Sequence, residues 1–118
     1  MIVILTQDLM MTSAVSAVSR SRSLDFKSAS GIDRVIKLVA ENQVSTLFVD
    51  LQLPDLDLQA LMAGLTGSNP KCPQVIAYAQ HVHVELLARA RQLGIEQVLT
   101  RGQVHGNLET LIPSRREG

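Results

Sequence analysis

Residues 45–55 read Ser-Thr-Leu-Phe-Val-Asp-Leu-Gln-Leu-Pro-Asp, and this stretch decides which fold the chain can adopt. Three large apolar residues follow one another at positions 47–49, without the polar alternation of a strand that has one face in water. Asp50 ends the run, and Pro54 prevents further strand pairing because proline has no backbone N–H. The stretch therefore predicts a strand that ends at a carboxylate. It also predicts that this strand is buried on both faces, as strands of parallel sheets are.

Outward from this strand, short apolar runs alternate with segments whose apolar residues have helical spacing. We expect strands at Ile2–Leu5, Leu24–Lys27, Ser45–Val49, Gln74–Tyr78 and Gln97–Leu99. We expect helices at Leu9–Val18, Gly31–Asn42, Leu58–Leu65 (stopped by Gly67, Asn69 and Pro70), Val84–Leu93 and Leu108–Ile112. Five successive strand–helix units predict an α/β fold, a doubly wound five-stranded parallel sheet with helices on both faces.

Length and composition limit the possible functions. The chain has 118 residues, which is room for one domain, and we expect that domain at 1–112 with a polar tail at 113–118. Eleven basic residues balance eleven acidic ones and only 3% are aromatic, which argues against nucleic-acid binding. Cys72 is the single cysteine, which excludes an intramolecular disulfide and suits a cytoplasmic protein. No apolar run approaches the ~18 residues of a transmembrane helix, so no membrane partner is expected.

Two carboxylates come at or just after the ends of predicted strands, namely Asp8 and Asp50. In a doubly wound sheet the functional site lies at the carboxyl ends of the strands. Two acids held together there repel one another, and a hard cation such as Mg²⁺ would relieve the repulsion. Arg101, at the end of the fifth strand, could meet an anion, which completes the parts for moving a phosphoryl group onto a carboxylate. The same residues also allow a structural interpretation, in which Asp8 caps a helix and Asp50 forms a turn.

The segment Leu47–Asp55 resembles the phospho-acceptor strand of response-regulator receiver domains (CheY-like), in which the strand ends in an aspartate and a proline follows four residues later. The resemblance extends over nearly the whole chain, from Met1 to about Ile112. It implies a flavodoxin-like strand order of 2-1-3-4-5 and a Mg²⁺-dependent aspartyl phosphate. By this resemblance Asp50 is the acceptor, Asp8 and Asp50 hold the metal with the backbone carbonyl of Gln52, and Arg101 pairs with the phosphate.

The chain also departs from the receiver pattern at several positions. Gln7 stands where receivers have the first of two acids, and Ala79 (Tyr78 if the match shifts by one) stands where they have a Thr or Ser. Arg101-Gly102 replaces a Lys-Pro pair, Val98 replaces an aromatic switch residue, and Leu58 replaces a glycine. Gln7 removes a negative charge, so Mg²⁺ should bind more weakly. Ala79 has no hydroxyl to hold a phosphoryl oxygen, and Arg101 offers a planar fork in place of a compact ammonium. The degenerate pattern therefore weakens both the acceptor chemistry and its usual readout.

The resemblance implies a signalling domain of a two-component system, not an enzyme that turns over a metabolite. In one interpretation Asp50 accepts a phosphoryl group and thereby alters partner contacts, with a histidine kinase or other phosphodonor protein upstream and a signalling protein downstream. In the alternative, the domain is a non-phosphorylated pseudo-receiver that acts as a protein interaction or dimerisation module, with a homodimer as one option. In both, the contact surface is expected around the fourth helix, the fifth strand and the last helix.

The remaining candidates are interpreted as structural. Met10 and Met11 are expected to fill the core from the first helix, and Cys72 to be a small buried residue. His81 and His83 are expected on the surface, since no further cysteine or histidine near them would complete a zinc site.

Overall fold

The computed structural model describes residues 1–68 and 72–113, so the predicted helix stop at Asn69 and Pro70 and most of the predicted tail lie outside the described residues. Within these described residues, five strands and six helices follow one another. They are β1 (Ile2–Leu5), α1 (Leu9–Ser21), β2 (Phe26–Ala29), α2 (Ile32–Glu41), β3 (Thr46–Asp50), α3 (Leu58–Ser68), β4 (Gln74–Ala79), α4 (Val84–Gln92), β5 (Gln97–Thr100), α5 (Arg101–Gly106) and α6 (Leu108–Leu111).

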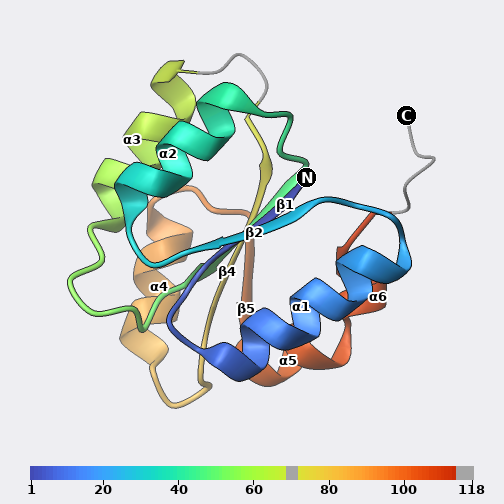
Figure 1. The fold of residues 1–118 in the computed structure, drawn as a ribbon. Helices are drawn as coiled ribbons and strands as arrows, with labels where there is room; N and C mark the ends of the chain where they lie inside the picture. Colours follow the sequence, from blue (N-terminus) through green and yellow to red (C-terminus); the bar gives the residue numbers. More distant parts are fainter. Residues whose placement is uncertain (69–71, 114–118) are drawn as a thin grey trace.

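The strands form one parallel sheet in the order β2-β1-β3-β4-β5, which confirms the predicted fold class and strand order. The helices α2, α3 and α4 cover one face of this sheet, and α1, α5 and α6 cover the other (Figure 1). The strand β3 lies in the middle of the sheet, with β1 on one side and β4 on the other. The strand that carries Asp50 is therefore the one most enclosed by its neighbours.

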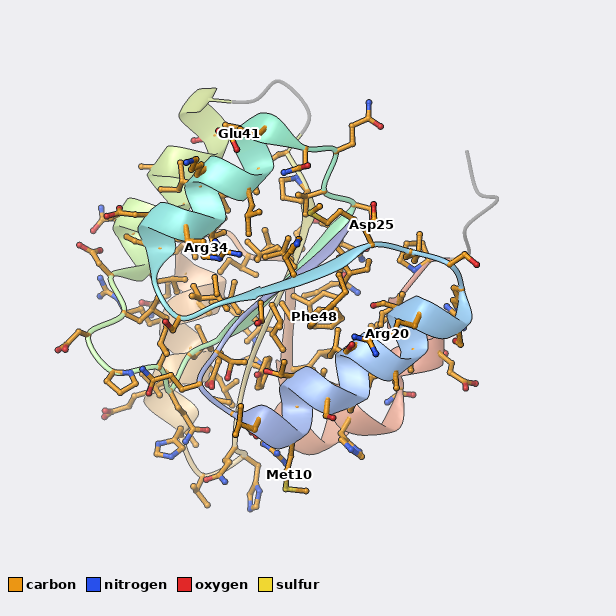
Figure 2. The ribbon with its side chains drawn as sticks, in the orientation of Figure 1. Met10, Arg20, Asp25, Arg34, Glu41 and Phe48 are labelled. Atoms are coloured by element: carbon orange, nitrogen blue, oxygen red, sulfur yellow. The ribbon has the colours of Figure 1, made fainter. Side chains whose placement is uncertain are left out.

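Alternation along each strand divides the core into two layers. Leu47 and Val49 point into the layer beneath α2, α3 and α4, whereas Phe48 points into the layer beneath α1, α5 and α6. Phe48 lies between the sheet and α1 in Figure 2. Because β1 and β3 are covered on both faces, their apolar residues are fully buried, which explains the unbroken apolar runs in the sequence.

Several element boundaries differ from the prediction. The helix α1 continues to Ser21, past the predicted end at Val18, and α3 continues to Ser68, past the predicted end at Leu65 and the predicted stop at Gly67. The edge strand β2 spans Phe26–Ala29, two residues later than predicted, and it follows a turn in which Ser23 has a positive φ of 58°. The strand β5 ends at Thr100, and Arg101 begins the short helix α5, which the apolar pattern did not reveal. The signal for this helix is polar: the Thr100 hydroxyl accepts a hydrogen bond from the Gln103 amide, and the Gln103 side chain accepts one from the Thr100 amide.

Two burial predictions were wrong. Cys72 is exposed, because it precedes β4 and the neighbouring Pro73 takes the buried position. Met11 is buried as predicted, but Met10 is 72% exposed because consecutive helical residues point about 100° apart. His81 and His83 are exposed, as predicted. None of the helices within residues 1–68 and 72–113 combines the length and the apolar character that a membrane span requires.

Candidate functional site

The site is built where β1, β3 and β4 end at the same edge of the sheet. Asp50 is the last residue of β3 and is half-buried, and its neighbour in β4 is Tyr78. The Leu51 amide donates to the Tyr78 carbonyl at 2.9 Å, so the sheet hydrogen bonds continue up to the base of the loop. These hydrogen bonds fix the position of Asp50 between the ends of β1 and β4.

Two donors hold the Asp50 carboxylate. The Thr6 hydroxyl donates to Oδ2 at 2.6 Å, and the Gln52 backbone amide donates to Oδ1 at 2.9 Å. Thr6 follows β1, where Ile2 and Ile4 point into the same layer as Phe48, so the alternation of the chain turns Thr6 toward Asp50. Both oxygens of Asp50 therefore already accept a hydrogen bond within the domain.

Asp8 is the N-cap of α1. Its Oδ1 accepts hydrogen bonds from the amides of Met10 at 3.0 Å and Met11 at 3.2 Å, and its own amide donates to the Thr6 hydroxyl oxygen at 2.9 Å. Its Oδ2 contacts the guanidinium of Arg101, at 2.9 Å from Nε and 2.8 Å from Nη2. Asp8 is thus a structural cap, as one interpretation of the sequence expected, and also one half of an ion pair.

The environment of Asp8 favours its charged form. Partial burial by itself would raise the pKa of Asp8, but the hydrogen bond from Arg101, the Met11 amide and the guanidinium charge together outweigh it. The pKa of Asp8 is consequently lowered from its usual value. The carboxylate remains ionised near neutral pH, with its charge neutralised by Arg101.

The structure thus brings together the predicted residues in part. Asp8 and Asp50 meet at the Thr6 hydroxyl group, which contacts both residues. Arg101 contacts Asp8, whereas the prediction placed it opposite an anion at Asp50. The prediction gave no role to Thr6, although the two-residue spacing of Thr6 from Ile4 was visible in the sequence.

Tyr78 is the residue that the sequence offered at the receiver Thr or Ser position if the match shifts by one. Its side chain points into the layer beneath α1, and its buried hydroxyl faces the side chain of Thr6. Burial raises the pKa of Tyr78, and the charges of Asp50 and Asp8 raise it further. Ala79 instead points into the opposite layer, so Tyr78 is the β4 residue that shares a face with Asp50.

The described residues do not fit a divalent cation at this edge. Both oxygens of Asp8 are engaged, one by helix amides and the other by Arg101, and Gln7 is exposed. A carboxylate paired with a guanidinium is a poor metal ligand, since the guanidinium already supplies the positive charge that a cation would bring. Within residues 1–68 and 72–113, no group of three acidic, histidine or cysteine side chains could hold a metal ion.

Comparison with known proteins places the fold. No family model and no curated protein sequence matches the chain. Solved structures do match. The receiver domain of NtrX from Brucella abortus superposes with a TM-score of 0.75 over 94% of this chain and 93% of its own, at 17% identity. The beryllofluoride-activated NtrC4 receiver domain dimer has a TM-score of 0.69 over 93% of this chain and 96% of its own, at 16% identity.

This chain has the receiver fold. A further match is the Saccharomyces cerevisiae Ssk1 receiver domain, solved with the phosphotransfer protein Ypd1, with a TM-score of 0.68 over 85% of this chain and 77% of its own, at 16% identity. Identities this low establish the fold and not the chemistry. Within the receiver fold, this chain joins the ends of β1 and β5 by the ion pair between Asp8 and Arg101.

Proposed function

We propose that this receiver-fold domain is a signalling module that works by binding other proteins, with its acidic site closed by an internal ion pair. The observation that carries this proposal is the contact between Arg101 and Asp8 Oδ2, at 2.8 and 2.9 Å. This contact places the permanent positive charge of Arg101 beside Asp8, the acid to which the resemblance assigned a metal ion. The domain would then be a pseudo-receiver, whose surface is presented without a phosphorylation step.

Whether a divalent cation binds beside Asp8 depends more on the number of ligands that it finds there than on the strength of the ion pair between Asp8 and Arg101. Arg101 and Asp8 are 30% and 27% exposed, and an ion pair that is partly in water stabilises a protein by about 1 kcal/mol or less. A bound cation could therefore displace Arg101 if other ligands compensated. Gln7 adds no carboxylate, however, so Asp50 is the one other carboxylate that the resemblance assigns to the cation.

Phosphoryl acceptance on Asp50 is the second candidate function. It is favoured by the position of Asp50, which is half-buried at the end of the central strand and therefore within reach of a donor. In this reaction an Asp50 oxygen would form a bond to phosphorus while the bond from phosphorus to the donor breaks and its electron pair leaves with the donor. A histidine kinase or other phosphodonor protein, and the Mg²⁺ that the resemblance implies, belong to this candidate.

One experiment separates the two candidates. The domain is incubated with acetyl phosphate, or with beryllofluoride, at millimolar Mg²⁺, and examined by intact-mass spectrometry and by ¹⁹F NMR. We expect neither a phosphoryl adduct nor a bound fluoride signal for the wild type. An adduct that is lost in Asp50→Asn would overturn the pseudo-receiver proposal and establish the second candidate.

The variant Arg101→Ala tests the physical reason. If the ion pair is what closes the site, removing the guanidinium frees Asp8 Oδ2, and Mg²⁺ should then perturb the Asp8 and Asp50 NMR signals more than it does in wild type. An equal response in both proteins would show that Arg101 does not exclude the cation. Sedimentation equilibrium of the wild type reports whether a second copy of this chain is a partner.

A further inference from the structure

The large apolar side chains that remain exposed are gathered at one edge of the molecule. Four large hydrophobic residues are exposed among those described: Leu9 at 81%, Met10 at 72%, Val82 at 66% and Val84 at 67%. Leu9 and Met10 are the first two residues of α1. Val82 lies in the connection between β4 and α4, and Val84 is the first residue of α4. Isolated exposed apolar residues are ordinary, but their restriction to the start of α1 and the start of α4, at one edge of the molecule, indicates an interaction surface.

The strand order places Asp50 between these two loops. The strand β3 lies between β1 and β4, so the loop after β3 lies between the start of α1 and the connection to α4. Figure 1 shows the start of α1 and the connection from β4 to α4 at the same, lower end of the molecule. In Figure 2, Met10 projects from this end, away from the ribbon. We call Leu9, Met10, Asp50, Val82 and Val84 the Asp50 face.

The centre of this face carries one negative charge without a partner cation. In the part of the chain that the structure describes, the one ion pair is that between Arg101 and Asp8, which leaves Asp50 with hydrogen bonds but no ion pair. Each hydrogen bond uses one lone pair of an Asp50 oxygen, and a carboxylate oxygen can accept more than one donor. A half-buried carboxylate flanked by apolar side chains is complementary to a single cation carried on an apolar stem.

The loops of this face are held in place before any partner arrives. The Gln52 side chain accepts a hydrogen bond from the Gln80 amide at 2.7 Å, which joins the loop after β3 to the loop after β4. The His83 amide donates to the Gln80 carbonyl at 2.9 Å, and Asp8 caps the helix that carries Leu9 and Met10. Little ordering is therefore required on binding, which favours affinity.

We propose that the Asp50 face docks a protein partner that presents one lysine or arginine to the Asp50 carboxylate, surrounded by apolar side chains that cover Leu9, Met10, Val82 and Val84. The apolar stem of a lysine or arginine packs against such side chains while its charged end reaches the carboxylate. This inference rests on the proposed function, because it requires Asp50 to remain an unmodified carboxylate. The sequence predicted a contact surface around the fourth helix, the fifth strand and the last helix; the Asp50 face lies instead at the carboxyl edge of the sheet and shares with that prediction only the start of α4.

The test uses a phage-displayed library of random linear peptides as the probe. Peptides are selected on the wild-type domain after depletion on a Leu9→Ser, Val82→Ser double variant, whose fold is checked by circular dichroism. We expect the enriched peptides to carry one Lys or Arg among apolar residues. Asp50→Asn should weaken the binding of these peptides about tenfold, as loss of a charged hydrogen bond predicts.

The matched control is Glu41→Gln, which removes one negative charge from α2. Glu41 lies at the upper end of the molecule in Figure 2, opposite Met10. Its substitution should leave peptide binding unchanged. Replacing the peptide cation by methionine should weaken binding to the wild type but have little further effect on Asp50→Asn, because both changes remove the same contact.

Three outcomes would overturn the inference: no peptide enriched on wild type over the double variant, enriched peptides without a cation, or equal binding to wild type and Asp50→Asn. These outcomes differ from failure of the proposed function, which shows itself as a phosphoryl adduct on Asp50. If the domain takes a phosphoryl group and yet binds cationic peptides when unphosphorylated, the proposed function fails and the docking surface stands.

Discussion

The hydroxyl of Thr6 donates to Oδ2 of Asp50 at 2.6 Å, and so joins two residues that are 44 positions apart in the chain. The same oxygen of Thr6 accepts the Asp8 amide at 2.9 Å. A neutral, buried hydroxyl thus lies where the ends of β1 and β3 meet. It links the aspartate of the central strand to the first turn of α1, and any change at Asp50 must also affect this contact.

Removing the Thr6 hydroxyl should destabilise the domain. Thr6→Val preserves the shape of the side chain but leaves the Asp8 amide and one Asp50 oxygen without their partner, and we expect a loss of about 1–3 kcal/mol in the free energy of unfolding. Urea denaturation measures this loss. Thr6→Ser, which keeps the hydroxyl, should recover most of it, and equal stability of Thr6→Val and wild type would show that the contact contributes nothing.

The lowered pKa of Asp8 predicts a specific dependence of stability on pH. The folded domain binds the Asp8 proton less tightly than the unfolded chain, whose pKa is near the ordinary 3.8, so the contribution to stability is present above that pH and is lost as the pH falls below it. Asp8→Asn should therefore lower stability at neutral pH and have a smaller effect at a pH below the folded pKa. Urea titrations of both proteins at the two pH values measure the difference.

Asparagine is a suitable substitution here because it caps helices about as well as aspartate does. The loss in Asp8→Asn is then due to the ion pair with Arg101, and added salt should reduce it. A loss that is the same at both pH values and in high salt would assign the role of Asp8 to capping alone.

The hydroxyl of Thr46 provides a test of core packing. Thr46 is fully buried at the start of β3, and its Oγ1 has no hydrogen-bond partner among the described residues. Thr46→Val replaces this hydroxyl by a methyl group of similar volume and should raise the free energy of unfolding by about 1 kcal/mol. Thermal and urea denaturation measure the gain, and a loss of stability would show that Oγ1 has a partner such as a buried water.

Tyr78 is the one tyrosine of the chain, which has no tryptophan, so tyrosine absorbance and emission report on the site directly. Because the pKa of Tyr78 is raised by burial, ionisation of the phenol favours the unfolded chain, whose pKa is near 10.0. Stability should accordingly fall as the pH rises above about 10, and the change in tyrosine absorbance should coincide with unfolding followed by circular dichroism. Tyr78→Phe should remove most of this alkaline sensitivity. A phenol that ionises reversibly near its ordinary pKa in the folded domain would contradict its burial.

The periodicity of the sequence was sufficient to predict a parallel α/β sheet with helices on both faces, because burial on both faces requires unbroken apolar runs. The strand order was predicted from the resemblance to receiver domains. The periodicity also located Asp8, Asp50 and Arg101, since the carboxyl ends of parallel strands share one edge. It missed the helix α5, whose start depends on a capping box between Thr100 and Gln103 and not on an apolar stripe. It also misjudged Cys72, whose exposure depends on the path of the chain into β4.

The choice of partner for each polar group depended on the tertiary structure. Local sequence cannot indicate that Arg101 turns to Asp8, 93 positions away, because that contact exists only once β1 and β5 are held in one sheet. Nor can it indicate that Tyr78, and not Ala79, shares a face with Asp50, since this depends on the register between β3 and β4. Apolar periodicity is local and therefore readable along the chain, whereas hydrogen bonds and ion pairs between distant residues are determined by the packing that the periodicity brings about.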